Sequence, residues 1–134
     1  MTRRLLIALA AAGALATPSF ADEPGPGGTK PPVAGTGEEV YKTFCQACHM
    51  AYAKGAVGAG VFPALASNPR MGTTAYAAYI IANGKGGMPW FRDALSKDQA
   101  RELIAYLRTH FGNDFREPVT AEDVAAFGQA PSRR

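Results

Sequence analysis

The feature that most constrains this chain is a five-residue motif, Cys45-Gln46-Ala47-Cys48-His49. It contains the only two cysteines of the 134-residue sequence, and a histidine directly follows the second. This C-x-x-C-H spacing is typical of c-type haem attachment, in which the two thiols become thioethers and the imidazole lies under the iron. A fold that carries such a group must wrap around a large flat ligand.

Three other uses of paired cysteines were weighed against haem attachment. A zinc site needs four ligands; the motif supplies three, and His110 is the one other histidine. A thioredoxin-like dithiol lies between a strand and a helix, and the sequence shows no strand pattern. A plain disulfide would account for the cysteines but not for His49. Haem attachment is therefore the preferred interpretation.

The first 21 residues predict a secretory signal peptide. Arg3 and Arg4 precede an uncharged apolar run over residues 5–16. Ser19 and Ala21 have the spacing of the small residues at a cleavage site. The apolar run is too short for a transmembrane helix. We therefore expect cleavage after Ala21, periplasmic localisation in a bacterium, and no membrane span in the mature chain.

Composition divides the mature chain into three parts. Residues 22–37 are rich in Pro and Gly and are predicted to form a flexible arm. Residues 38–112 are predicted to fold as one domain, and 113–134 to form a C-terminal extension with a short helix.

The formal net charge of +3 includes two leader arginines, so the mature chain is nearly neutral and offers no basic patch for nucleic acid. So small a domain is short of core, and a buried haem would supply apolar contacts.

Hydrophobic periodicity predicts three core helices. The first two cover residues 38–45 and 75–82. The third is the clearest, because Ser96 opens it with a capping box and it is predicted to run to Phe111, where Gly112 stops it. Its apolar stripe has helical spacing and consists of Ala100, Leu103, Ile104, Leu107 and Phe111.

The remaining segments are predicted to be loops and one short helix. Residues 53–72 and 83–95 are rich in Gly and Pro and are assigned to loops. Long loops in a small domain need a bound group to wrap around. In the extension, Thr120 and Asp123 predict the start of a helix that ends at Phe127.

Four side chains compete for the second axial position on the iron: Met50, Met71, Met88 and His110. Met88 is favoured because it lies in the glycine-rich loop 84–90, where the backbone can approach a flat ligand closely and a proline stiffens the turn. Met50 adjoins the motif and falls on the wrong face. Met71 is the reserve candidate, and His110 is interpreted as a surface residue at a helix end.

Three cations lie in the loops near these candidates, namely Lys54, Lys85 and Arg92. They either ring an exposed haem edge, where they would guide a partner, or are solvated loop charges. Trp90 either packs on the haem or fills the core.

In order along the chain, the leader, the C-x-x-C-H motif, Phe62-Pro63-Ala64-Leu65, Gly86-Gly87-Met88-Pro89 and a final amphipathic helix resemble class I cytochrome c. The likeness is strongest to the monohaem domains that accompany periplasmic dehydrogenases, and it covers about residues 35–112. It implies an all-α fold of three core helices plus loops wrapped around one covalent haem c.

The resemblance also implies roles for particular residues. The first and last core helices are expected to cross, with Gly37 and Tyr41 lying against Leu103 and Tyr106. Pro63 matches the proline whose carbonyl accepts a hydrogen bond from the second nitrogen of His49, a contact that orients the ring and raises its basicity.

The function implied by the resemblance is single-electron transfer. With His49 and Met88 as axial ligands, the iron has no open position, so a carrier and not an enzyme is expected. It would be a soluble monomer that takes electrons from a periplasmic dehydrogenase and passes them to a terminal oxidase or another cytochrome. Two alternatives stay open: a subunit of one obligate dehydrogenase complex, and a small haem sensor or enzyme if Met88 is labile.

Overall fold

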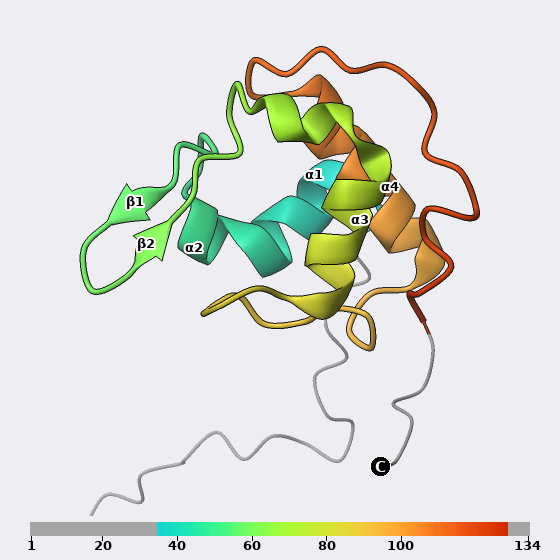
Figure 1. The fold of residues 1–134 in the computed structure, drawn as a ribbon, viewed down its shortest axis with the longest axis horizontal. Helices are drawn as coiled ribbons and strands as arrows, with labels where there is room; N and C mark the ends of the chain where they lie inside the picture. Colours follow the sequence, from blue (N-terminus) through green and yellow to red (C-terminus); the bar gives the residue numbers. More distant parts are fainter. Residues whose placement is uncertain (1–34, 129–134) are drawn as a thin grey trace, which may run out of the picture. The chain divides into compact units, whose positions relative to one another are not determined.

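The computed structural model describes residues 35–128, so the predicted signal peptide and most of the predicted arm lie outside it. The described part is mainly helical, as Figure 1 shows. Its elements in chain order are α1 (Gly37–Val40), the π-helix η1 (Tyr41–Cys45), α2 (Gln46–His49), β1 (Ala56–Val57), β2 (Val61–Phe62), the 3-10 helix η2 (Pro69–Gly72), α3 (Thr74–Asn83) and α4 (Lys97–Thr109). Within residues 35–128, no helix has both the length and the apolar character needed to cross a membrane.

The first helical stretch is longer than predicted and contains a π-helical segment. Thr36 and Glu39 cap its start reciprocally, since each side chain accepts a hydrogen bond from the backbone of the other. α1, η1 and α2 then follow without a break, so the stretch runs from Gly37 to His49 instead of from 38 to 45. Gly37, the last residue of the predicted arm, is therefore part of the folded domain. Single-turn π-helices are frequent at functional sites.

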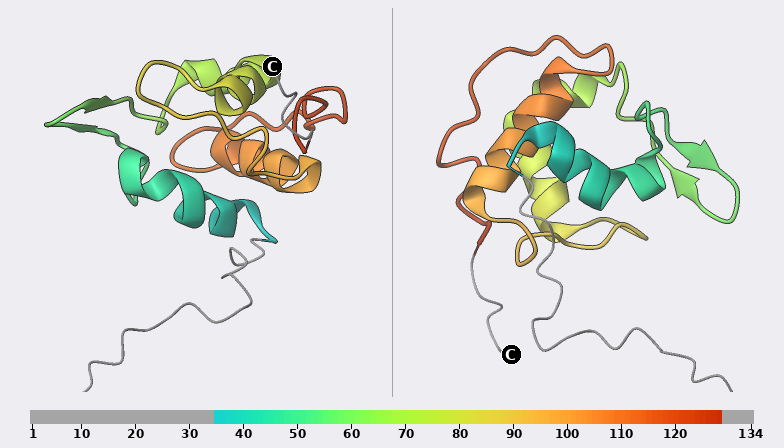
Figure 2. Two further views of the ribbon diagram at one scale, coloured as in Figure 1. Left: turned by 90° about the horizontal axis from the view of Figure 1, so that it is seen from below. Right: turned by 180° about the vertical axis from the view of Figure 1, so that it is seen from behind.

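α1 and α4 cross in close contact, as both views in Figure 2 show. A Cβ on Gly37 would lie 2.5 Å from the Cβ of Tyr106 and would collide with the backbone of Glu102. Glycine is therefore required for this approach. The ring of Tyr41 lies 6.2 Å from that of Tyr106, and Leu103 is fully buried beneath them. The crossing implied by the resemblance is present.

The two later helices agree with the prediction except at one end. α3 extends the predicted 75–82 by one residue on each side. The capping box of α4 is present, because Ser96 and Gln99 each accept a hydrogen bond from the other's backbone. α4 ends at Thr109, before the predicted Phe111, because the backbone of His110 is extended, with ψ 176°, and Phe111 then adopts φ +57°.

A small hairpin and a 3-10 helix occupy the segment predicted to be a loop. β1 and β2 pair antiparallel, with Ala56 opposite Phe62 and Val57 opposite Val61. The expectation that the chain has no strand was therefore wrong, although each strand has only two residues. Because the hairpin is so small, the all-α fold class stands.

The predicted short helix in the C-terminal extension does not form. Thr120 and Asp123 make the expected reciprocal cap, but residues 121–126 form successive turns. The backbone bonds there span three residues, as in the bond from the Phe127 N–H to the Val124 carbonyl. Val124 and Phe127 are buried, so the described part of the extension belongs to the core.

Candidate functional site

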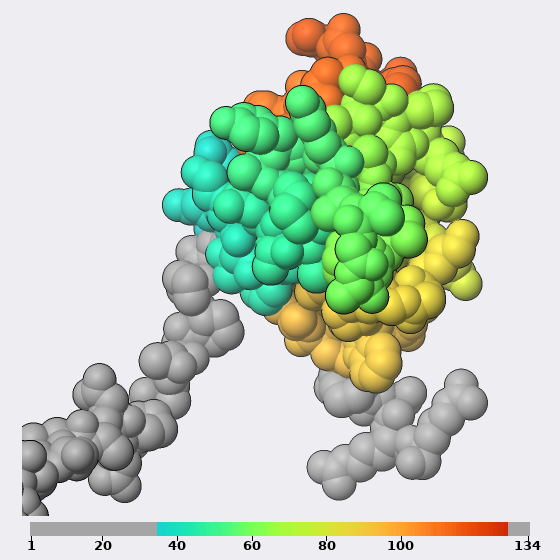
Figure 3. All heavy atoms as spheres, turned by 90° about the vertical axis from the view of Figure 1, so that its left-hand side faces the viewer, coloured from blue at the N-terminus to red at the C-terminus, as the bar shows by residue number. Residues whose placement is uncertain are grey.

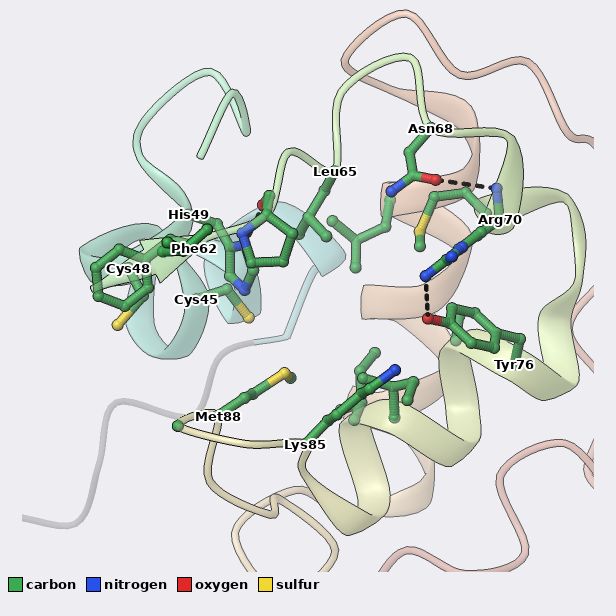
Figure 4. Close-up of a pocket in the computed structure, with 18 of the residues that line it drawn as sticks. Cys45, Cys48, His49, Phe62, Leu65, Asn68, Arg70, Tyr76, Lys85 and Met88 are labelled. Carbon is green, nitrogen blue, oxygen red and sulfur yellow. Dashed lines mark hydrogen bonds between the residues drawn. The ribbon is translucent and has the colours of Figure 1, made fainter. Parts of the chain in front are cut away.

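A cavity of about 660 Å³ lies between α2, the hairpin, loop 63–71, α3 and loop 84–90 (Figure 4). Sites for small molecules and cofactors have volumes of roughly 300–1,000 Å³. Apolar side chains line most of it. The polar and sulfur-containing side chains of its lining are Cys45, Cys48, His49, Asn68, Arg70, Met71, Tyr76, Lys85 and Met88.

The two cysteines of the motif lie on one wall of the cavity (Figure 4). Neither thiol is bonded to the other; Cys45 is buried and Cys48 is exposed. Burial raises the pKa of the Cys45 thiol to about 12, and the neighbouring Cys48 adds a smaller rise. At neutral pH the folded chain therefore presents Cys45 as a neutral thiol. The geometry favours covalent attachment of both sulfurs to one edge of a ligand.

His49, the last residue of α2, is buried and lines the same cavity. Its Nδ1 lies 3.0 Å from the carbonyl oxygen of Pro63. A carbonyl can only accept a hydrogen bond, so Nδ1 carries the proton and Nε2 keeps a free lone pair. A neutral imidazole held in this way is a competent metal ligand. The hydrogen bond that the resemblance implies is therefore present.

Met88 reaches the cavity from the glycine-rich loop. The loop is a tight turn in which Lys85 and Met88 exchange two backbone hydrogen bonds of 3.1 Å. Gly84 has φ +72°, and a Cβ there would lie 2.8 Å from the carbonyl carbon of Pro89. Figure 4 shows the sulfur of Met88 pointing into the cavity on the side facing His49. A thioether and an imidazole thus enter from facing walls.

The other candidate ligands are placed differently. Met71, in η2, is buried and also lines the cavity, so it remains a reserve candidate. Met50 is exposed and follows α2 with φ +65°, outside the cavity lining. His110 is exposed, stacks on Tyr106 with ring centroids 4.1 Å apart, and donates from Nδ1 to the Tyr106 carbonyl. His110 therefore has the surface role predicted for it.

A basic group of side chains lies at the end of the cavity away from the cysteines (Figure 4). Arg70 Nη1 donates to the Tyr76 hydroxyl at 3.2 Å, and the guanidinium carbon lies 5.7 Å from the centre of the Tyr76 ring. Lys85 lines the cavity as well, and among residues 35–128 no Asp or Glu side chain does. This end suits carboxylates of a bound group. Neither Arg70 nor Tyr76 was predicted from the sequence. Asn68-Pro69 was the available signal for Arg70, because Asn68 caps η2, which contains it.

The structure decides between the alternatives left open for two loop residues, Arg92 and Trp90. Arg92 is half buried, and its guanidinium donates to the Ala82 carbonyl and the Asn83 side chain, so it fixes the end of α3 and is not free for docking. Lys54 and Lys85 are exposed. Trp90 is 64% exposed and does not fill the core.

The residues of this cavity fit a covalently attached haem. Two thiols lie at one end, and cationic and hydroxyl groups lie at the other, where the porphyrin carboxylates would be. An imidazole with a free Nε2 and a thioether lie on the two facing walls. Figure 3 shows that the hairpin and loop 84–92 lie beside each other on one face of the molecule.

The comparisons with known proteins agree with this site. The family described as "Cytochrome C oxidase, cbb3-type, subunit III" matches residues 32–107. No curated protein matches the chain. The matched range covers more than half of the chain and includes the C-x-x-C-H motif, Pro63 and Met88.

Several solved structures are similar to the chain. Cytochrome CL from the marine methylotrophic bacterium Methylophaga aminisulfidivorans MPT is 26% identical, with 72% of this chain and 67% of that chain covered and a TM-score of 0.49. Cytochrome c6 from the diatom Phaeodactylum tricornutum is 24% identical, with 55% and 88% covered and a TM-score of 0.45. The dihydro-haem d1 dehydrogenase NirN is 34% identical, with 65% and only 18% covered and a TM-score of 0.45.

Proposed function

The chain belongs to the cytochrome c family described as cbb3-type cytochrome c oxidase subunit III, and on that premise we propose that it is a periplasmic electron carrier whose iron is ligated by His49 and Met88. It binds one covalent haem c, and Cys45 and Cys48 fit the attachment motif. When bound, the haem supplies an iron that gains and loses a single electron. The remaining chemistry is that of the chain's own side chains.

The observation that carries the proposal is the placement of two ligating side chains on facing walls of one cavity. Pro63 keeps the proton of His49 on Nδ1, so Nε2 is the nitrogen available to the iron. Met88 offers a thioether from the other side. With His49 and Met88 both bound to it, the iron would offer oxygen or peroxide no free coordination site, and the group would exchange electrons through its exposed edge. Thioether ligation raises the reduction potential relative to two histidines.

Other cavity residues hold the group in place. The apolar lining excludes water, and Arg70 and Tyr76 are positioned to bind a carboxylate of the haem. Because the ligands remain bound in both oxidation states, little rearrangement accompanies each transfer.

Carbon monoxide tests the carrier assignment directly. Added to the reduced holoprotein at neutral pH, it should leave the visible spectrum almost unchanged, whereas Met88→Ala should bind it readily. Peroxide turnover by the wild-type protein should be negligible. Rapid, complete carbon monoxide binding by the wild type would instead favour the sensor or enzyme alternative.

The proposed partners are a periplasmic dehydrogenase as donor and an oxidase or another cytochrome as acceptor. The predicted signal peptide and the resemblance support this assignment, and the protein is proposed to be monomeric between encounters. The exposed Lys54 and Lys85 would guide docking, and Arg92 would not, because its guanidinium is already bound. Encounters of this kind are weak and bury little surface.

Stopped-flow reduction by a dehydrogenase encoded nearby tests the docking role. The rate should fall with ionic strength, and the slope should decrease in Lys54→Gln and Lys85→Gln. Lys97→Gln, at an exposed residue outside the cavity lining, is the control. A rate independent of salt would remove the docking role of both lysines. Stoichiometric copurification with one dehydrogenase would favour the obligate-subunit alternative.

A further inference from the structure

We infer that Asn113, which lies just beyond the family-matched region, is a positioning residue for the haem: it fixes loop 63–68 and thereby the Pro63 carbonyl that orients His49. The inference rests on the proposed function, because the orientation of His49 matters in this way only if it ligates the iron.

The side chain of Asn113 is buried and uses all of its polar atoms. Its Oδ1 accepts a hydrogen bond of 2.8 Å from the Asn68 N–H. Its Nδ2 donates to the carbonyl of Leu65 at 2.9 Å and to that of Leu107 at 2.8 Å. An amide offers one acceptor and two donors, and here one bond goes to α4 and two go to the cavity loop. A residue that only capped α4 would need the Leu107 bond alone.

The backbone at this junction is strained on both sides. Ser67 and Phe111 have φ of +48° and +57°, values that non-glycine residues seldom adopt. The two strained residues are joined directly, because the Ser67 N–H donates to the Phe111 carbonyl at 3.0 Å. This distance lies within the range of about 2.9–3.1 Å that is typical of good hydrogen-bond geometry. Such conformations persist only where surrounding contacts over-determine them. The two Asn113 bonds to the loop are side-chain contacts of this kind.

The loop connects this junction to the histidine. The backbone N–H of Leu65 donates to the Ala53 carbonyl at 2.7 Å, while the Leu65 carbonyl accepts from Asn113. The backbone of Leu65, two residues after Pro63, is therefore held on both sides of its Cα. Asn68 Nδ2 also donates to the Ala64 carbonyl at 2.8 Å. Hydrogen bonds thus hold both residues that follow Pro63, and they limit the directions in which its carbonyl can point toward His49.

The experiment compares Asn113→Ala and Asn113→Asp with Val124→Ala in the full-length holoprotein. Asn113→Asp keeps the acceptor for Asn68 but loses both donors. Val124 is buried in the same extension and has only an aliphatic side chain, so its variant controls for lost stability. Two properties are measured: solvent exchange of the His49 Nδ1–H by proton NMR of the reduced protein, and the midpoint potential.

The Asn113 variants should exchange the His49 proton about tenfold faster or more, because loss of one ordinary hydrogen bond shifts an opening equilibrium by about that factor. Their midpoint potentials should rise, since a weaker bond to Pro63 makes the imidazole less basic and stabilises Fe(III) less. Val124→Ala should lower the unfolding temperature and leave both properties at wild-type values.

Asn113 variants that match Val124→Ala in both properties would overturn the inference. Asn113→Asp decides the question if Asn113→Ala yields no holoprotein. Failure of the proposed function is seen separately, in the wild-type protein, as absence of covalent haem or of reversible one-electron cycling.

Discussion

The phenol of Tyr41 donates a 2.7 Å hydrogen bond to the carbonyl oxygen of Met50, the residue directly after the motif histidine. Met50 has φ +65°, a conformation that is costly for a residue with a side chain. The Tyr41 ring is buried and lies 5.0 Å from the ring of Phe111. The helix crossing therefore anchors the end of the segment that carries the haem attachment motif.

This buried phenol predicts a loss of stability in alkali. Desolvation by burial raises the pKa of Tyr41 to about 12, above the value of about 10 expected in the unfolded chain. The unfolded chain thus releases the proton first. The free energy of unfolding keeps its full value, as far as Tyr41 is concerned, below about pH 10. It falls by roughly 2 kcal/mol between about pH 10 and 12. Denaturant titrations of the holoprotein across this range measure it.

Tyr41→Phe is the control for this pH dependence. It should be less stable at neutral pH by about 1 kcal/mol, because it loses the bond to Met50, and its stability should fall less steeply in alkali. Tyr106 titrates in both proteins, so the difference between them isolates Tyr41. Equal slopes in the two proteins would contradict the role given to the buried phenol.

Replacement of each cavity methionine identifies the sixth ligand. Met88→Ala should abolish the weak far-red sulfur-to-iron absorption band of the oxidised protein and lower its midpoint potential. Met71→Ala should keep the band and lose about 2–5 kcal/mol of stability, because Met71 is a buried core residue. If the band disappears in Met71→Ala and survives in Met88→Ala, the assignment passes to Met71.

The apoprotein is expected to be largely unfolded. An empty cavity of about 660 Å³ would cost at most on the order of 15 kcal/mol at about 24 cal/mol per Å³, an upper limit because water can enter its open side. The stability of a small domain is about 5–15 kcal/mol, so even part of this cost would remove most of it, and we expect the cavity to collapse or unfold without its ligand.

Circular dichroism of Cys45→Ala/Cys48→Ala tests this expectation against the wild-type holoprotein. The variant should have little helix and no cooperative thermal transition, whereas the wild type should retain its haem through denaturing gels and acid-acetone extraction. A cooperative transition near that of the holoprotein would show that the polypeptide core suffices.

Two features of the sequence predicted their structures well because each is local. The C-x-x-C-H motif predicts that both sulfurs and the imidazole line one site, as they do, although the helix that carries them was predicted to end at Cys45 and runs to His49. The capping box of Ser96 marks the start of α4. The hairpin was not predictable, since strands of two residues such as Ala56–Val57 are too short to show alternation. The predicted helix after Thr120 failed because a cap does not supply an amphipathic stripe, and Gly128 closes the segment a few residues later.

The burial of Arg108 was missed although the sequence carried a signal for it. Arg108 lies four residues after Ile104 and therefore falls on the apolar stripe of α4. A charged side chain is expected on this buried face only if hydrogen bonds or an ion pair compensate its charge. Its Nε donates to the Met71 carbonyl at 2.9 Å, and its Nη1 and Nη2 bind the carbonyl and carboxylate of Glu117 at 2.5 and 2.8 Å. The partners are distant in sequence, so pattern alone cannot name them.

Variants at the two ends of this contact should differ in stability. Arg108 is 1% exposed, whereas the Glu117 side chain is 75% exposed. Arg108→Leu should cost about 3–5 kcal/mol, because it leaves buried carbonyls without donors, and Glu117→Gln should cost less than about 1 kcal/mol. Chemical denaturation of both holoproteins measures the difference. Equal losses would mean that the ion pair, and not the backbone carbonyls, retains Arg108.

The π-helix between Tyr41 and Cys45 makes the chain unequally tolerant of single-codon deletions. Each residue of an α-helix advances the chain by about 100° around its axis. A π-helix holds one residue more than an α-helix between its hydrogen-bonded ends, so loss of one residue from η1 would convert it to α-helix and leave α2 close to its register. A residue lost from α2 itself would rotate His49 by about that angle, away from the cavity. A residue lost from 58–60, the tip of the hairpin, would shorten only an exposed turn. Length variation among natural homologues should therefore be concentrated at that tip, with loss of a single residue tolerated in η1 and none tolerated in α2.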